Sequence, residues 1–226
     1  MEDTRPNYLN YDANLTLSPA RAINGNIVTL DWIQSLIARG FGWHTQVGTL
    51  ITPIVGGGNG TVIIIGRPEL LISIPAGQCM LPYRVNVQCQ CPLLATDADK
   101  VEISITADTT QKWDGTGTFT SKVPTNARTD IGGACPAQAA SSFSAAVTQT
   151  IVMSNDYART LLTGDVQGTP ATAIWTRPEL IWEPKNPPII MGPAMLVIHY
   201  GGTVAVNGYV QAEFLMLPST LFQNLI

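Results

Sequence analysis

The alternation of apolar and polar residues is clearest between Tyr83 and Cys91. Every second residue there is a tyrosine, a valine or a cysteine, and the residues between them are Arg, Asn and Gln. A period of two places the two sets on opposite faces of an extended chain. The segment is therefore predicted to form a half-buried β-strand, with Tyr83 and Cys91 on the same inner face.

Similar patterns recur along the chain and predict about eight strands after residue 60. Nine segments carry these patterns, namely 61–65, 70–74, 83–91, 101–106, 113–123, 145–154, 171–182, 194–200 and 209–217, and the first two are separated only by Gly66-Arg67-Pro68 and Glu69. The connections 106–116, 125–142 and 156–169 are long enough to cross between two sheets. Eight antiparallel strands in two sheets form a jelly roll, so the predicted fold is an all-β, antiparallel jelly-roll β-sandwich. Its expected core residues are Val85, Val87, Ile103, Ile105, Val197, Val210 and Phe214.

The chain before residue 61 has a different pattern. Residues 1–26 carry Pro, Asn and Asp between isolated apolar side chains, which predicts an extended arm. Residues 29–41 have apolar residues at helical spacing, and Gly40 can end a helix. The glycine-rich segment 56–60 is expected to act as a hinge. The sequence thus predicts an arm, a short helix and a hinge over 1–60, and the sandwich over 61–226.

One short motif occurs twice. Arg67-Pro68-Glu69-Leu70 reappears as Arg177-Pro178-Glu179-Leu180, each time before an apolar run. Proline lacks a backbone donor and is found at strand starts or edges. Both copies are interpreted as strand entries and not as a catalytic motif.

The charge content limits the classes of partner. Only 12% of the residues are charged, about half the usual share of roughly 25%, and the formal net charge is -4. Lys and Arg form no cluster, so direct binding of nucleic acid is not expected. No apolar run is long enough to span a bilayer, and the first six residues do not resemble a secretory signal.

Catalytic and cofactor chemistry is not expected. The segment 56–61 lacks the lysine of a phosphate-binding loop and leads into a strand. The two histidines are poor candidates for the base of a nucleophile triad, because His44 lies beside Trp43 in a glycine-flanked turn and His199 is in phase with apolar residues of a strand. The four cysteines are too few for a disulfide scaffold and lack the paired ligands of a zinc site.

Four aspartates and one tryptophan are the remaining candidates for a binding site. Asp97, Asp99, Asp108 and Asp114 lie around one predicted strand, and such oxygen-rich loops suit calcium if they converge at one end of the sandwich. Asp is also a favoured turn residue, so a solvated turn is the simpler expectation and no metal is assigned. Trp113 occupies a polar turn and is predicted to be an exposed ligand contact.

The strand and turn patterns at 71–77, 83–91, 192–197 and 208–214 resemble those of virion proteins with a single jelly-roll domain, such as viral or phage capsid and head-decoration proteins. The resemblance covers about the last three quarters of the chain. It implies self-assembly into a shell or its surface layer, with copies of the chain and other virion proteins as partners. It also implies assembly in the host cytoplasm and residence in the virion. The chain differs from many RNA-virus coats because it lacks a basic arm.

The residues themselves favour assembly by a separate argument. A surface with so little charge is prone to associate, and apolar side chains in both terminal segments are expected to be covered by neighbouring subunits. These predicted assembly residues are Tyr8, Leu9, Tyr11, Leu15, Leu17 and Phe222. The alternatives are a carbohydrate- or receptor-binding β-sandwich that uses Trp113 and the Asp-rich loops, and a hydrolase on the same fold.

Overall fold

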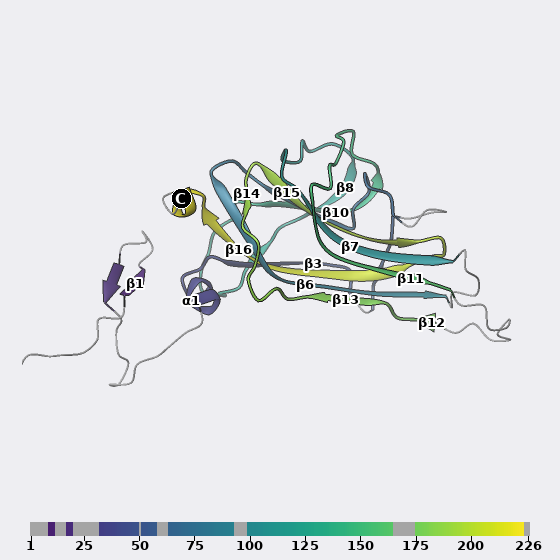
Figure 1. The fold of residues 1–226 in the computed structure, drawn as a ribbon, viewed down its shortest axis with the longest axis horizontal. Coiled ribbons are helices and arrows are strands. Elements are labelled where there is room, and N and C mark those ends of the chain that lie inside the picture. The colour runs from purple at the N-terminus through teal and green to yellow at the C-terminus, as the bar shows by residue number, and fades with distance from the viewer. Residues whose placement is uncertain are drawn as a thin grey trace, which may run out of the picture.

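The computed structural model describes residues 9–11, 17–19, 32–49, 51–57, 63–92, 99–164 and 175–223. Most of these residues lie in two antiparallel β-sheets that pack face to face (Figure 1). The chain is therefore an all-β sandwich, as the alternating patterns predict. None of the helices in the described ranges is long and apolar enough to cross a membrane.

The strands of one sheet are β3 (Gly42–Val47), β4 (Ile54–Val55), β6 (Gln78–Pro92), β9 (Thr125–Asn126), β12 (Trp175–Thr176), β13 (Glu179–Trp182), β14 (Ile190–Met191) and β16 (Asn207–Pro218). The strands of the other are β5 (Leu70–Ile74), β7 (Lys100–Asp108), β8 (Thr118–Lys122), β10 (Gln138–Ala145), β11 (Asn155–Thr163) and β15 (Ala194–Gly202). A separate pair consists of β1 (Leu9–Tyr11) and β2 (Leu17–Pro19), and the helices are α1 (Trp32–Ala38) and α2 (Thr220–Gln223).

The long strands pair in a regular order. In the eight-stranded sheet, β3 pairs with β16, β16 with β6, and β6 with β13. In the six-stranded sheet, β5 pairs with β15, β15 with β7, and β7 with β11. The strands β8 and β10 extend the six-stranded sheet beyond β5.

The main core lies between the two sheets and contains the inward residues of β6, β7, β15 and β16. Val85, Val87, Ile103, Ile105, Val210 and Phe214 belong to it and are fully buried, as predicted. Val197 is also buried, but it lies on the opposite face of β15, in a second cluster with Met195 and Trp113. All nine residues of β15 are buried. On the outer face of its sheet, Trp113, Val147 and Ile151 of the segment 109–154 belong to one cluster with Met195 and Val197.

Tyr83 does not share a face with Val85. The register between β6 and β16 shifts at this point, since Arg84 pairs with Glu213 whereas Pro82 pairs with Phe214. Tyr83 is the extra residue of this bulge. Its side chain packs on the outer face of the sheet against the cluster of Cys79, Leu81, Leu215 and Leu217, as do Leu36 and Ile37 of α1. A bulge moves the residues before it to the opposite face of the sheet. The alternation over 85–91 is unaffected, so it gave no sign that Tyr83 faces the other way.

The predicted domain division at residue 60 is wrong. β3 lies inside the eight-stranded sheet between β16 and β9, and β4 also pairs with β16. The first half of the predicted hinge is anchored too, because Gly56 N donates to Val206 O at 2.8 Å and Gly57 N donates to the carboxylate of Glu69. The sandwich thus begins at β3, while residues 58–60 lie outside the described ranges.

One predicted strand, 145–154, and one predicted loop, 156–169, are also wrong. The alternating stretch 147–153 is a loop, whose Val147 and Ile151 pack into the second cluster. The strand β11 occupies much of the predicted loop 156–169. As an edge strand it is half exposed, so its sequence shows no clean alternation. The predicted strand 61–65 is likewise absent over residues 63–65, which precede β5.

The single predicted helix is present but shorter than expected. It covers Trp32–Ala38, and Gly40 ends it with a positive φ of 87°, as predicted for a C-terminal glycine. Residues 29–31 lie outside the described ranges. The helix packs over the end of the eight-stranded sheet, where Leu36 and Ile37 contact Leu215 and its neighbours.

Candidate functional site

The four aspartates do not converge. Asp99 precedes β7 and Asp108 ends it, which separates the two by about 30 Å along an extended strand. Asp97 lies outside the described residues. No group of three or more His, Cys, Asp or Glu side chains in the described ranges is placed to hold a metal ion.

Asp108 and Asp114 instead order their own loops. Asp108 is buried and accepts hydrogen bonds from Thr110 N at 2.9 Å and Val152 N at 2.8 Å. Burial raises its pKa, but these bonds and those from the Thr110 and Gln111 side chains outweigh it and lower the pKa overall. The exposed Asp114 has a lowered pKa because Thr116 donates its hydroxyl and backbone N–H to it. Both aspartates therefore stabilise turns.

Trp113 is not an exposed ligand contact, contrary to prediction. Its side chain is only 7% exposed. The indole packs edge-on against Phe119, with ring centroids 4.6 Å apart, and against Phe143. Its Nε1–H donates to Thr116 O at 3.1 Å. The polar residues around Trp113 in the sequence form the turn that carries it into the second cluster.

His44 is exposed on β3, and its Nε2 lies 2.8 Å from the Thr125 hydroxyl, a hydrogen bond that links β3 to β9. His199 is buried, and its Nε2–H donates to Ile65 O at 3.0 Å. Burial lowers its pKa to about 4, so the ring is neutral at physiological pH. Burial also raises the pKa of Cys79 to about 11, which makes that thiol a poor nucleophile.

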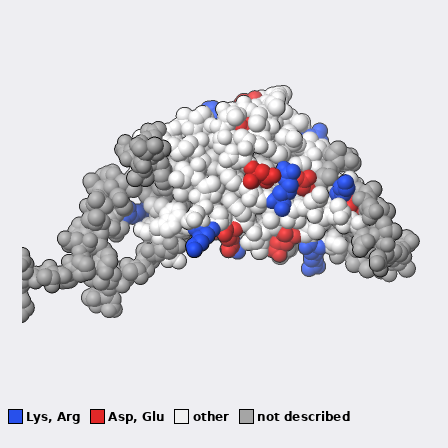
Figure 2. Space-filling view, in the orientation of Figure 1, with Lys and Arg blue, Asp and Glu red and all other residues white. Residues whose placement is uncertain are grey.

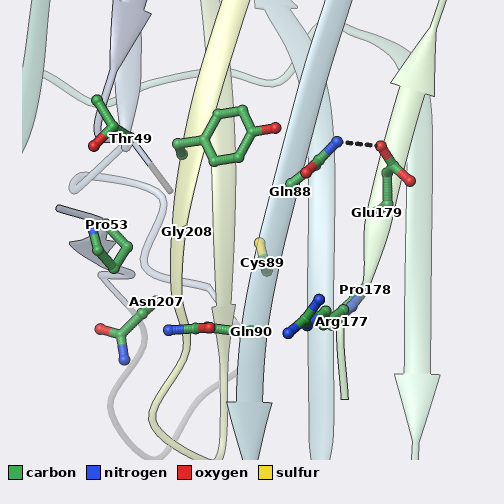
Figure 3. Close-up of a pocket in the computed structure, with 11 residues that line it drawn as sticks. Thr49, Pro53, Gln88, Cys89, Gln90, Arg177, Pro178, Glu179, Asn207 and Gly208 are labelled. Atoms are coloured by element: carbon green, nitrogen blue, oxygen red, sulfur yellow. Dashed lines mark hydrogen bonds between the residues drawn. The ribbon is translucent and has the colours of Figure 1, made fainter. Parts of the chain in front are cut away.

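A pocket lies on the outer face of the eight-stranded sheet, over Gly208 (Figure 3). We call it the Gly208 pocket. It has a volume of about 360 Å³ and is formed by the β3–β4 loop, by 88–90 of β6, by 177–179 at the start of β13, and by the start of β16. Such a volume falls at the lower end of ordinary ligand pockets.

The strand register explains which side chains meet in this pocket. Gln88 pairs with Tyr209 on one side and with Glu179 on the other, and Gln90 pairs with Asn207. Paired residues share a face of the sheet, so the polar positions of β6 meet the polar positions of β16 and β13. Gln88 Nε2 donates to Glu179 Oε1 at 2.5 Å across the β6–β13 pair (Figure 3).

The floor of the pocket requires glycine at position 208. A Cβ atom at Gly208 would lie 2.5 Å from Gln88 O and 3.1 Å from Cys89 Sγ. The wall opposite β13 is the β3–β4 loop, which turns at Gly48 with a φ of 71° and is closed by Thr49 N donating to Thr52 O at 3.0 Å. The pocket is thus built on strands and on a hydrogen-bonded turn.

The two copies of the repeated tetrad have different roles. Glu179 is exposed at the rim of the Gly208 pocket. Burial raises the pKa of the neighbouring Tyr209, and the charge of Glu179 raises it further. Glu69 is only 3% exposed and accepts hydrogen bonds from Gly57 N and from Tyr200 N, the latter at 2.7 Å. Burial raises its pKa to about 8 despite these bonds.

The sequence patterns did not reveal the Gly208 pocket. The alternation at Gln88 and Gln90 correctly indicated outward polar residues, and the tetrad marked the entry to β13. The partners at 49–53 and 207–209, however, are distant in the sequence and meet β6 only through strand pairing. Comparison of the chain with protein-family models, with curated proteins and with solved structures finds no match.

Proposed function

We propose that this chain is a virus or phage structural protein, a jelly-roll subunit that self-assembles into a capsid or its surface layer. In this proposal its partners are copies of itself and other virion proteins, its location is the virion, and it has no enzymatic role. The observation that carries the proposal is the order in which its long strands pair.

Eight strands support the jelly-roll interpretation: β3, β5, β6, β7, β11, β13, β15 and β16. The first pairs with the last, the second with the seventh, the third with the sixth and the fourth with the fifth. This is the order produced when one long hairpin is rolled into two sheets, as in a jelly roll of two Greek keys.

An exposed apolar edge supports association between copies. The neighbouring edge strands β11 and β13 carry Leu161, Leu162 and Ile181, of which Leu161 is 53% exposed. Edge strands with apolar side chains readily pair with another chain. Among the described residues, β1 and β2 pair only with each other, which leaves the arm available to a neighbour.

The predicted assembly residues of the termini are not tested by the structure. Tyr8 and Leu15 lie outside the described residues, as do the side chains of Leu9, Tyr11, Leu17 and Phe222. Leu221 is described, and it packs against the sandwich beside α1. The start of the apolar tail is therefore covered by its own subunit.

Deletion of residues 1–26 is expected to leave a folded sandwich but to abolish large particles. The strands described in the arm, β1 and β2, belong to neither sheet of the sandwich, so the far-UV circular dichroism spectrum should stay that of a β-sandwich. Light scattering should shift from large particles to small oligomers, and negative-stain electron microscopy should show shells for the full chain alone. Identical particles from the truncated chain, or a stable monomer of the full chain at high concentration, would contradict the assembly proposal.

Nucleic-acid binding is expected to be absent or incidental. On the face in Figure 2, acidic and basic side chains are interspersed in the lower half and form no continuous basic area. Arg84 pairs with Glu183 at 2.8 Å, and Arg159 pairs with Asp156 at 3.1 Å and Glu102 at 3.3 Å. Affinity for single- or double-stranded DNA should be weaker than about 1 μM at physiological salt. Fluorescence anisotropy with labelled oligonucleotides measures it, and tighter binding would refute this expectation.

A further inference from the structure

The Gly208 pocket contains hydrogen-bonding groups that have no partner in the part of the chain the structure describes. The side chains of Gln90, Asn207 and Arg177 come from three different segments and make no hydrogen bond with any described residue. Figure 3 shows Asn207 and Gln90 side by side, with Arg177 on the far side of Gln90. Each amide offers both donors and an acceptor, and the guanidinium offers donors only.

The charges at the pocket favour an uncharged ligand. Arg177 and Glu179 are the two ionised groups that line it, and they are two residues apart on the same rim. An anion that approached Arg177 would also meet Glu179, and a cation at Glu179 would meet Arg177. The remaining polar lining residues are amides and hydroxyls, which suit hydroxyl groups that donate and accept at once.

The pocket also has apolar surface. Tyr209 is half-buried and lines it from β16, and Pro53 lines it from the β3–β4 loop. In the same loop the side chain of Ile51 is 92% exposed. An aromatic ring beside convergent amides matches a ligand with C–H groups on one face and hydroxyls at its edge, because C–H groups pack favourably on such rings.

The arrangement is built in advance of binding. Gln90 and Asn207 are held opposite each other by the β6–β16 register, and Cys89 N donates to Pro178 O at 2.9 Å, which ties the Arg177 rim to β6. The strand pairing fixes the backbone positions of these residues, so a ligand has to order only their side chains.

From these observations we propose that the Gly208 pocket binds a neutral saccharide of about one or two sugar rings, in line with its volume. Gln90 and Asn207 bind neighbouring hydroxyls, Arg177 donates to a ring or glycosidic oxygen, and Tyr209 contacts the C–H face of the sugar. This adds a glycan-binding activity to the proposed structural role and does not depend on it.

Saturation-transfer difference NMR on the full chain tests the proposal with the methyl glycosides of glucose, galactose, mannose and N-acetylglucosamine, and with glucose 6-phosphate as an anionic counterpart. At least one neutral glycoside should bind. The Gln90→Ala/Asn207→Ala variant should weaken that binding about 10-fold or more, the expected result of losing several neutral hydrogen bonds. Arg177→Ala should weaken it as well, which provides a second test if the double variant misfolds.

The matched control is Gln138→Ala, which removes an exposed amide from β10 in the other sheet. It should bind the same glycoside as the unmodified chain. Absence of signal for all four glycosides, unchanged binding in both pocket variants, or tighter binding of glucose 6-phosphate than of every neutral glycoside would overturn the proposal. Light scattering of the same samples reports assembly separately, so failure of one proposal is distinguishable from failure of the other.

Discussion

Phe214→Ala is expected to lower the free energy of unfolding by about 3 to 5 kcal/mol, the usual loss for a buried phenylalanine. The Phe214 side chain is fully buried in the middle of β16, between the two sheets. Its removal leaves a cavity that well-packed strands on both sides cannot close. Urea titration followed by tryptophan fluorescence measures the change as a shift in the unfolding midpoint.

Phe119→Ala is the matched control for this prediction. Phe119 is only partly buried and lies on the edge strand β8, where it contacts Trp113 from one side. Its loss should cost less because the edge can relax around the smaller side chain. Equal effects of the two substitutions, or an unchanged midpoint for Phe214→Ala, would show that the inter-sheet core does not dominate the stability.

The second large effect concerns Glu69 and pH. This carboxyl is buried between the segment 54–57 and β15, and its pKa is raised from 4.5 to about 8, mainly by burial. Between these two pH values the folded chain retains a proton that the unfolded chain has lost. The contribution of Glu69 to the free energy of unfolding is therefore largest below pH 4.5, and it falls as the pH rises towards 8.

The measurement is clearest between pH 6.5 and 8.5. Below 6.5 the buried His199, with its pKa lowered to about 4, opposes the trend because the unfolded chain gains a proton there. Above about 9 the thiol of Cys89 begins to ionise in the unfolded chain. From pH 6.5 to 8 the Glu69 contribution should fall by about 2 kcal/mol, since each pH unit is worth about 1.4 kcal/mol.

Glu69→Gln should remove this pH dependence, whatever it does to the stability at a single pH. Glu179→Gln is the matched control, because Glu179 occupies the same position in the second copy of the tetrad but is exposed. It should retain the slope of the unmodified chain. Thermal melts at four pH values in the window provide the comparison, and a flat profile for the unmodified chain would contradict the raised pKa of Glu69.

The Glu69 carboxyl links the segment 54–57 to β15. Its two oxygens bind Gly57 N and Tyr200 N, and Tyr200 Oη donates to Ile54 O at 2.9 Å. A Cβ atom at Gly56 would lie 2.6 Å from Tyr200 O, so this segment approaches β15 too closely for any other residue. Ionisation of Glu69 is expected to loosen the 54–57 segment first.

The sequence alone was sufficient to determine the long, two-sided strands. Over 85–91 of β6, 101–106 of β7 and 208–213 of β16, residues of the inter-sheet core alternate with polar or outward-facing residues, which gives a period of two in the sequence. The inward positions such as Val87, Ile103 and Val210 therefore follow from the alternation by itself. The outward positions of Gln88 and Gln90 follow for the same reason, although their function does not.

Only the tertiary structure decided the features that depend on a distant partner. Trp113 is surrounded by polar residues in the sequence, yet it is buried because Phe119 and Phe143 meet it from strands β8 and β10. Tyr83 changes face because β16 pairs with β6 through a bulge. Glu69 and Glu179 share a tetrad but differ in burial because different segments pack over them. Local patterns report the average environment of a segment, whereas burial at one position depends on which segments pack against it, and short-range sequence does not encode that choice.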